Sequence, residues 1–303
     1  MCGSMAPGVP KLSVVIASVS GAASILECLE RLEALPERDQ MEVLVLDRRT
    51  DGTAEAVARR FPWVRLEAGL AGRSIPELRW KGMRAARGEM IAVIEDHCLV
   101  EPGWGAEILR FLDSPYGAVG GPVENGATGR ILDWAFFLAE YGPCMPPLQE
   151  GEVDLAPGNN VAYRRAVLPL DEPAWGSLWE SFLQKELRRR GVRIYLSPPM
   201  RLYHKKSFRL GEMLGQRFLY SRSFAAMRAA GKPAWLRLTL AAASILLPPL
   251  LLVRILANLV RKRRNLREFF LALPVLVLFV SGWAAGEVAG CLAGAGDSLA
   301  RVD

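Results

Sequence analysis

Apolar positions follow two different patterns before residue 201. Short apolar runs rich in β-branched residues predict strands that are buried on both faces. Between them, apolar residues recur every three or four positions, which is the period of a helix with one buried side. Strands are expected at residues 12–17, 42–46, 64–66, 91–94, 116–121 and 193–196, and helices at 25–35, 54–60, 75–87, 104–112, 133–141 and 179–190. The alternation predicts an α/β fold with a mostly parallel central sheet.

Capping residues mark the ends of several of these helices. Ser24 and Ser74 are the expected N-caps, and Ser74 is followed by Pro76 and Glu77 in the pattern of a capping box. Gly191 is the expected stop of the helix that precedes the last strand. The first strand is not followed by a Gly-x-Gly-x-x-Gly sequence, and no Walker sequence is present, so a dinucleotide site of the usual kind is not expected.

One stretch carries the clearest chemical signal. The apolar run at residues 91–94 ends abruptly in Glu95, Asp96 and His97, and Pro102-Gly103 then forces a turn. Open α/β sheets bind ligands at the carboxyl ends of their strands, which is where these three side chains are expected. Two acids and an imidazole are costly to bury there unless they bind something. The alternative is a strand end that simply turns into solvent.

Two long apolar blocks lie after the α/β region, at residues 238–260 and 269–292. Each has about the 20 residues that a bilayer crossing requires, although core helices of a soluble protein are an alternative. Two full crossings would place the basic loop at 261–267 outside, against the positive-inside rule. Pro248-Pro249 interrupts the first block, so we expect a re-entrant or in-plane hairpin there. The second block contains Glu287 and is the candidate for a crossing.

Charge and hydropathy agree with this division. The chain has 303 residues, 51% of them hydrophobic, and a net charge of +6. Basic residues cluster between Arg201 and Arg267, and at 205–232 they interleave with aromatic and apolar residues, which predicts an interfacial helix. A cationic band beside an apolar tail favours anionic lipid headgroups over nucleic acid, because no base-reading motif is present.

Cysteine usage and the N-terminal sequence bear on the compartment. The five cysteines are odd in number and form no Cys-x-x-Cys pair, which argues against a disulfide framework or structural zinc. The first eight residues lack the basic and apolar regions of a signal peptide. The bulk of the chain is therefore expected in the cytoplasm.

The order of motifs over residues 11–230 resembles that of a family 2 glycosyltransferase with the GT-A fold. The first strand, which ends at Ala17 and Ser18, resembles the strand whose end contacts the nucleotide. Asp47 begins a turn that resembles the acidic turn recognising the base. Arg79-Trp80-Lys81-Gly82 resembles the Arg-Asn-x-Gly helix, with tryptophan in place of asparagine. Gly158-Asn159-Asn160 resembles the loop that closes on the transferred sugar.

The resemblance also implies a metal site and a base. Glu95-Asp96-His97 takes the place of the family's Asp-x-Asp metal motif, and which of the three binds metal stays open. Glu180 falls where the family has its general base, and His204 matches a histidine that can face the metal. The resemblance thus implies Mn²⁺ or Mg²⁺ bound among Glu95, Asp96, His97 and His204.

These residue types suit the chemistry independently of the family. A departing nucleoside diphosphate needs its charge neutralised, which a divalent ion on oxygen ligands achieves. Imidazole suits Mn²⁺ better than Mg²⁺. An acceptor hydroxyl loses a proton as it attacks, and the Glu180 carboxylate can accept it. A polyprenyl phosphate acceptor is already an anion and needs no base.

The sequence therefore predicts a GT-A domain at residues 1–232, including the interfacial helix at 201–232, and membrane-associated helices at 233–303. We expect a metal-dependent, inverting transfer from a nucleotide-sugar to a lipid-linked or membrane-proximal acceptor. From nucleotide-sugar use and the basic band, we expect the catalytic domain on the cytoplasmic face of the cell inner membrane. The alternatives are a nucleotidyltransferase, which would release pyrophosphate, and an inactive membrane scaffold.

Overall fold

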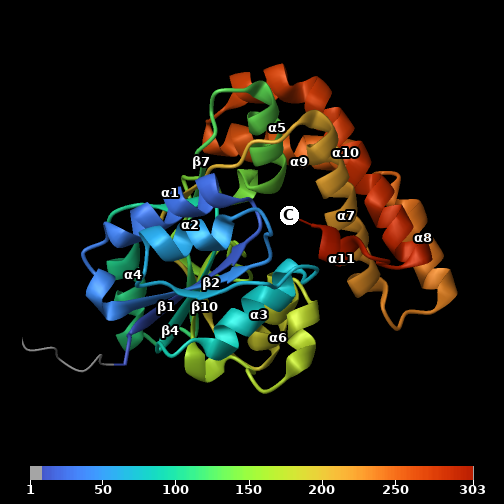
Figure 1. The fold of residues 1–303 in the computed structure, drawn as a ribbon. Coiled ribbons are helices and arrows are strands. Elements are labelled where there is room, and N and C mark those ends of the chain that lie inside the picture. The colour runs from blue at the N-terminus through green and yellow to red at the C-terminus, as the bar shows by residue number, and fades with distance from the viewer. Residues whose placement is uncertain (1–8, 303) are drawn as a thin grey trace, which may run out of the picture. The chain divides into compact units, whose positions relative to one another are not determined.

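The computed structural model describes residues 9–302 (Figure 1). The expectation about a signal peptide falls on the first eight residues and lies outside the described part. The chain divides into two compact units, one formed by Met1–Val123 and Leu148–Tyr203 and the other by Glu124–Pro147 and His204–Asp303. The domain limits expected at 1–232 and 233–303 stay a prediction.

The first unit is built on an eight-stranded sheet with the order β3-β2-β1-β4-β9-β6-β10-β8. Neighbouring strands from β3 to β4 are parallel, β9 is antiparallel to both of its neighbours, β6 and β10 are parallel, and β8 is antiparallel. The α/β fold with a mostly parallel central sheet is thereby confirmed. The strands are β1 (Leu12–Ser18), β2 (Met41–Asp47), β3 (Arg65–Glu67), β4 (Met90–Glu95), β6 (Ala118–Gly120), β8 (Gly151–Val153), β9 (Asn160–Arg164) and β10 (Ile194–Leu196).

The central strands are buried on both faces, as their unbroken apolar runs indicate. Every residue of β1 and β2 is buried, and β4 is buried until Glu95. Helices cover the two faces, with α1 and α2 on one side and α3 and α6 on the other (Figure 1). The helices of this unit are α1 (Ala22–Glu33), α2 (Thr53–Arg60), α3 (Ile75–Ala85), α4 (Trp104–Arg110) and α6 (Glu180–Arg189).

One of the two predicted N-caps is confirmed. The Ser74 hydroxyl accepts from the Glu77 N–H at 3.4 Å, and the Glu77 carboxylate accepts from the Ser74 N–H at 2.8 Å, which completes the capping box. Ser24 was the wrong choice, because α1 begins at Ala22 with Gly21 as its N-cap. Gly21 has a φ of 96°, a conformation that glycine adopts at little cost. Helix α1 therefore begins without a side-chain cap.

The expectation that 193–196 is the last strand was also wrong. A second sheet has the order β5-β11-β7, formed by β5 (Cys98–Val100), β11 (Leu202–His204) and β7 (Val123–Asn125). Each of these strands has three residues, too few for an apolar period to be visible in the sequence.

The second unit is helical and centres on α10. This helix packs against α5, α7, α8 and α9. Gly286 and Gly290 face the backbone of α7, where a Cβ atom would overlap the carbonyl oxygens of Phe218 and Arg222. The helices are α5 (Ile131–Glu140), α7 (Leu210–Ala229), α8 (Ala234–Ser244), α9 (Leu247–Lys262), α10 (Leu266–Ala293) and α11 (Ser298–Arg301).

The charged residue within the second apolar block has a partner. Glu287 of α10 is 4% exposed and forms an ion pair with Arg228 of α7. A buried carboxylate without a partner would be costly in this apolar setting. The ion pair with Arg228 compensates the negative charge of Glu287 within the apolar helix α10.

Among the described residues, α10 is long and apolar enough to cross a membrane, and a second span is possible if α8 and α9 together count as one. The axes of α8 and α9 differ by 57° across a short break. The break lies at residues 245–246, and Pro248 and Pro249 occupy the first turn of α9, where proline is tolerated. The interruption of the first block therefore precedes the prolines rather than coinciding with them.

Candidate active site

The parallel pairing of β1 with β2 and β4 brings the predicted donor-binding residues to one edge. In the register of these strands, Ala17 lies opposite Glu95, and Ser18 lies opposite Asp47. All four residues are at or next to the carboxyl end of a strand. The parallel arrangement brings these four residues to one edge of the sheet.

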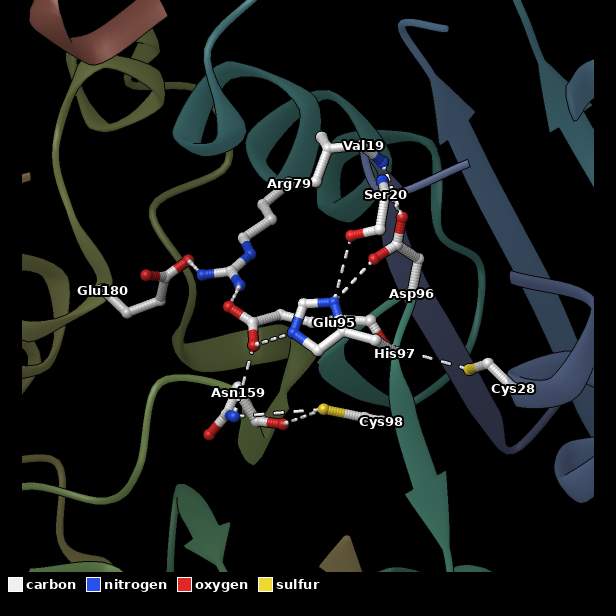
Figure 2. Close-up of polar contacts among 10 residues, drawn as sticks. All are labelled: Val19, Ser20, Cys28, Arg79, Glu95, Asp96, His97, Cys98, Asn159 and Glu180. Atoms are coloured by element: carbon white, nitrogen blue, oxygen red, sulfur yellow. Dashed lines mark hydrogen bonds and ion pairs between the residues drawn. The ribbon is translucent and has the colours of Figure 1, made fainter. Parts of the chain in front are cut away.

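Asp96 follows β4 and is fully buried. One carboxylate oxygen accepts the backbone N–H groups of Val19 and Ser20, at 2.7 and 2.6 Å. The other oxygen lies 2.8 Å from Nδ1 of His97 (Figure 2). Both oxygens are thus used within the fold, one to hold the loop after β1 and one to orient the imidazole.

His97 is held from its Nδ1 side, because the Ser20 hydroxyl also lies 3.2 Å from that nitrogen. The other ring nitrogen, Nε2, lies 3.3 Å from Oε2 of Glu95. A carboxylate on one imidazole nitrogen fixes the ring and leaves the other nitrogen for a ligand, which is the usual support of a metal-bound histidine. Glu95 and His97 therefore present an oxygen and a nitrogen side by side (Figure 2).

Arg79 joins the strand edge to α6. Its guanidinium lies between two carboxylates, with Nη2 at 3.0 Å from Oε1 of Glu95 and Nη1 at 2.5 Å from Oε1 of Glu180. The Arg79 side chain is 4% exposed and that of Glu180 is 9% exposed, so this bridge is shielded from water. The Arg79 side chain thereby contacts both Glu95, a predicted metal ligand, and Glu180, the predicted base (Figure 2).

The two asparagines of the predicted sugar loop have different surroundings. Asn159 donates from Nδ2 to Oε2 of Glu95 at 3.3 Å, so it belongs to the same cluster. Asn160 accepts the indole N–H of Trp104 at 2.9 Å and donates to the carbonyls of Pro122 and Met200 at 3.0 and 2.8 Å. The Asn160 side chain is therefore engaged in holding the fold. Gly158 lies close to Glu180, since a Cβ atom there would be 3.3 Å from the Glu180 Cβ.

Asp47 is buried at the end of β2, and burial raises the pKa of its carboxyl above the ordinary value. The Arg49 N–H approaches one carboxylate oxygen at 3.4 Å, and the other oxygen has no hydrogen-bond partner among the described residues. A buried acceptor of this kind requires a hydrogen-bond partner.

Trp80, which replaces the family's asparagine, has a packing role in this structure. It is 4% exposed, and a Cβ atom at Gly176 would lie 3.2 Å from its ring. Gly176 belongs to the short 3-10 segment Pro173–Ser177, which contacts α3. The tryptophan therefore packs α3 against this segment.

His204 is the last residue of β11 and the first residue of the second unit. Within that unit its ring stacks on Phe136, with centroids 5.6 Å apart, and lies 4.5 Å from the Tyr141 ring. The histidine is 2% exposed. Its predicted role as a metal ligand stays a prediction.

Sequence reasoning missed the parts of the site that carry no distinctive side chain. The backbone N–H groups of Val19 and Ser20 are supplied by a small-residue loop with no motif of its own. Two cysteines also border the cluster, since Cys98 lies beside Asn159 and the Cys28 thiol points toward the Glu95 carbonyl (Figure 2). Burial raises the pKa of the Cys98 thiol well above its ordinary value, which keeps it neutral.

Comparison with known proteins assigns the class of this arrangement. The family model described as glycosyl transferase family 2 matches residues 13–210. The chain therefore belongs to glycosyl transferase family 2, and the predictions of a glycosyltransferase and of a GT-A fold are confirmed.

Two particular proteins are similar to this chain. Polypeptide N-acetylgalactosaminyltransferase 12 of Mus musculus is 31% identical over 135 residues, which are 42% of this chain and 23% of that protein. The chain thus spans less than a quarter of the length of this curated relative. The mannosyltransferase PcManGT from Pyrobaculum calidifontis, solved with GDP-Man and Mn²⁺, has a TM-score of 0.55 and 19% identity, with 94% of this chain and 88% of that chain covered. At this identity the similarity establishes the fold alone.

The position of Asp96 predicts a specific stability effect. Asp96→Ala removes the acceptor of the buried Val19 N–H and the partly buried Ser20 N–H, and a buried donor left unsatisfied costs about 1–3 kcal/mol. Asp96→Asn retains one acceptor oxygen and should cost less. Urea denaturation of the purified chain measures both changes. Asp171→Ala, at an exposed position, is the control and should stay within about 0.5 kcal/mol of the parent. Equal stability of Asp96→Ala and the parent would show that this carboxylate does not hold the β1 loop.

Proposed function

We propose that this chain is a metal-dependent, inverting glycosyltransferase that moves a sugar from a nucleotide-sugar donor to a lipid-linked or membrane-proximal acceptor. The observation that carries the proposal is the Glu95-His97 pair at the strand edge of a family 2 fold, with Asp96 orienting the imidazole. Asp96 then acts as a positioning residue and need not be a ligand itself.

The side chains suit a divalent ion. Glu95 offers a carboxylate oxygen beside the imidazole nitrogen of His97, and His204 is proposed as a further ligand on its residue type alone. A mixed set of oxygen and nitrogen donors favours Mn²⁺ over Mg²⁺, which prefers oxygen alone. The solved mannosyltransferase of similar fold contains Mn²⁺. When bound, the ion would neutralise negative charge on the departing nucleoside diphosphate.

We assign roles to the remaining predicted site residues from where they lie in the fold. Asp47 keeps an unused buried oxygen at the edge, which suits an N–H donor of the nucleotide base. Ala17 and Ser18 line the same edge beside it. Asn159 and the Gly158 backbone face the cluster and suit the sugar and acceptor. Nucleotide-sugar donors are the substrates expected of this family, and the similar solved structure holds GDP-Man.

Glu180 is the proposed general base for a hydroxyl acceptor. It is the first residue of α6, and Arg79 fixes its position. Direct attack by the activated hydroxyl on the sugar carbon, on the side opposite the departing diphosphate, inverts the configuration. A phosphate acceptor would not require this proton transfer, and Glu180 would then position the acceptor.

Surface composition supports a membrane location. The described part of α8, α9 and α10 exposes large apolar side chains, namely Trp235, Leu238, Leu250, Val253, Val260, Phe270, Leu271, Val277, Leu278 and Leu292. Soluble surfaces rarely gather so many, and such patches mark contact with lipid or another protein. We propose that this surface contacts the inner membrane and that the catalytic unit is cytoplasmic.

The metal proposal predicts that His97→Ala abolishes Mn²⁺-dependent binding of a nucleoside diphosphate, because it removes a ligand. Asp96→Asn should weaken this binding by about 10- to 100-fold, the usual effect of losing the carboxylate that supports a ligating histidine. Calorimetric titration with and without Mn²⁺ measures both effects. Unchanged Mn²⁺-dependent affinity in His97→Ala would place the ion elsewhere. Absence of metal-dependent nucleotide-sugar turnover in the parent would favour the inactive scaffold.

The base proposal predicts that Glu180→Gln binds donor normally but loses turnover by roughly 10²- to 10⁴-fold. Glu186→Gln on the same helix is the matched control, because Glu186 pairs with Arg189 and Arg190 and has no contact with the cluster among the described residues. Steady-state kinetics and donor titration give the two quantities. A decrease of less than tenfold would support a phosphate acceptor or a structural acid.

The membrane proposal predicts that the basic loop after α9 stays on the cytoplasmic side. Arg267 is exposed and helical, so Arg267→Cys in a cysteine-free background is a mild probe, whereas Asn265 has a φ of 56° and forms the N-cap. The new thiol should resist a membrane-impermeant reagent in intact cells and react after lysis. Labelling in intact cells would contradict the hairpin and require α8 and α9 to cross together.

A further inference from the structure

A cavity of about 580 Å³ lies within the second unit, lined by residues of α5, α9 and α10 and by Pro143. Its volume is in the range of about 300–1,000 Å³ that is usual for ligand pockets. The lining is Ala139, Glu140, Pro143, Leu251, Arg254, Ile255, Ala257, Asn258, Arg261 and Trp283. None of these residues was assigned a role by sequence or by the active site.

Arg254 is the most informative member of this lining. It lies in the middle of the apolar helix α9 and is exposed, and it has no hydrogen bond or ion pair among the described residues. Its neighbour Val253 is 65% exposed, and Leu250, one turn earlier, is 60% exposed. An arginine without a partner on an apolar surface is costly beside a membrane, which makes Arg254 a candidate for a functional contact.

The other charges of the pocket leave it cationic. Glu140 is neutralised by an ion pair with Arg217, whose guanidinium lies 3.8 Å from the centroid of the Trp283 ring. Arg261 donates to Asn258, which is uncharged, at 2.9 Å. The charges of Arg254 and Arg261 therefore remain uncompensated by any acid that lines the cavity.

The cavity is also held in shape at the end of α9. Asn258 donates to the Gly142 carbonyl at 2.7 Å, and the Lys262 ammonium binds the carbonyls of Pro143, Met145 and Pro147. These bonds fix α9 against the segment that follows α5. The two arginines are thus presented from a fixed helix.

We propose that this cavity binds the phosphate headgroup of an anionic membrane phospholipid, with Arg254 and Arg261 on the phosphate. The apolar members Leu251, Ile255 and Ala257 contact the adjoining glycerol and acyl carbons. Free phosphate has no use for these apolar walls, whereas a lipid presents both chemistries at once. Basic pockets between membrane helices bind lipid headgroups in this way. The inference rests on the proposed membrane association and goes beyond it by naming the site.

The test uses Trp283, which lines the cavity, as its reporter. The full chain is mixed with phosphatidylcholine vesicles containing a minor fraction of phosphatidylglycerol with brominated acyl chains, since bromine quenches tryptophan fluorescence on contact. The chain has eight tryptophans, so the share due to Trp283 is the difference between the parent and Trp283→Phe. That share should be quenched by brominated phosphatidylglycerol and much less by brominated phosphatidylcholine.

The double variant Arg254→Gln/Arg261→Gln should require at least roughly tenfold more phosphatidylglycerol for the same Trp283 quenching, because it removes both guanidinium groups that bind the phosphate. Arg263→Gln/Arg267→Gln removes the same charge from exposed positions outside the cavity and should retain the parent response. Equal losses in both double variants would reduce the effect to general attraction and overturn the proposal.

Two further results would also overturn it. Equal quenching of Trp283 by brominated phosphatidylcholine would show no selection for an anion. Displacement by inorganic phosphate would identify a free phosphate ligand. Failure of the chain to bind either vesicle would instead refute the membrane association itself. Mn²⁺-dependent nucleoside diphosphate binding, measured by calorimetry, should be the same in both double variants.

Discussion

The carboxylate of Asp96 connects the end of β4 to the loop after β1, and the geometry of the proposed active site depends on that connection. Parallel pairing brings the strand ends together, but it does not fix the loop that follows β1. Two backbone N–H groups of that loop bind one Asp96 oxygen, and the second oxygen sets the rotation of His97. A ligand atom must be held within a fraction of an ångström to be useful, so this buried acid defines where the Nε2 atom of His97 lies beside Glu95.

The acids around this point are not independent of one another. Arg79 contacts Glu95 on one side and Glu180 on the other, and both contacts are largely shielded from water. In such a low-dielectric network, a change in the charge of one member alters the energy of the others, so their contributions do not add. Any movement of Glu95 toward a cation would weaken its contact with Arg79 and change how Glu180 is held. In the proposed mechanism, donor binding at Glu95 and acceptor activation at Glu180 would therefore be linked through the Arg79 guanidinium.

Much of this architecture follows from local sequence. The long apolar runs of β1, β2 and β4 and the capping box at Ser74 have strong local signals, and both were predicted. The cluster of Glu95, Asp96 and His97 was also located, but the sequence left their individual roles open. Those roles depend on the loop after β1, which is distant in sequence from β4. The three-residue strands β5, β7 and β11 were missed for the same reason, since their pairing partners and not their own patterns define them.

The position of α10 along the chain has a consequence for biosynthesis. This helix supplies the surface against which α5, α7, α8 and α9 pack, yet it leaves the ribosome after all four of them. Until then, Arg228 lacks the carboxylate of Glu287, and the backbone of α7 lacks the glycine face that it later contacts. During synthesis the four earlier helices therefore lack their common packing partner. They expose apolar surface that a membrane or a chaperone would have to cover. A nascent chain that ends before residue 266 lacks α10 and cannot complete the helix packing of the second unit.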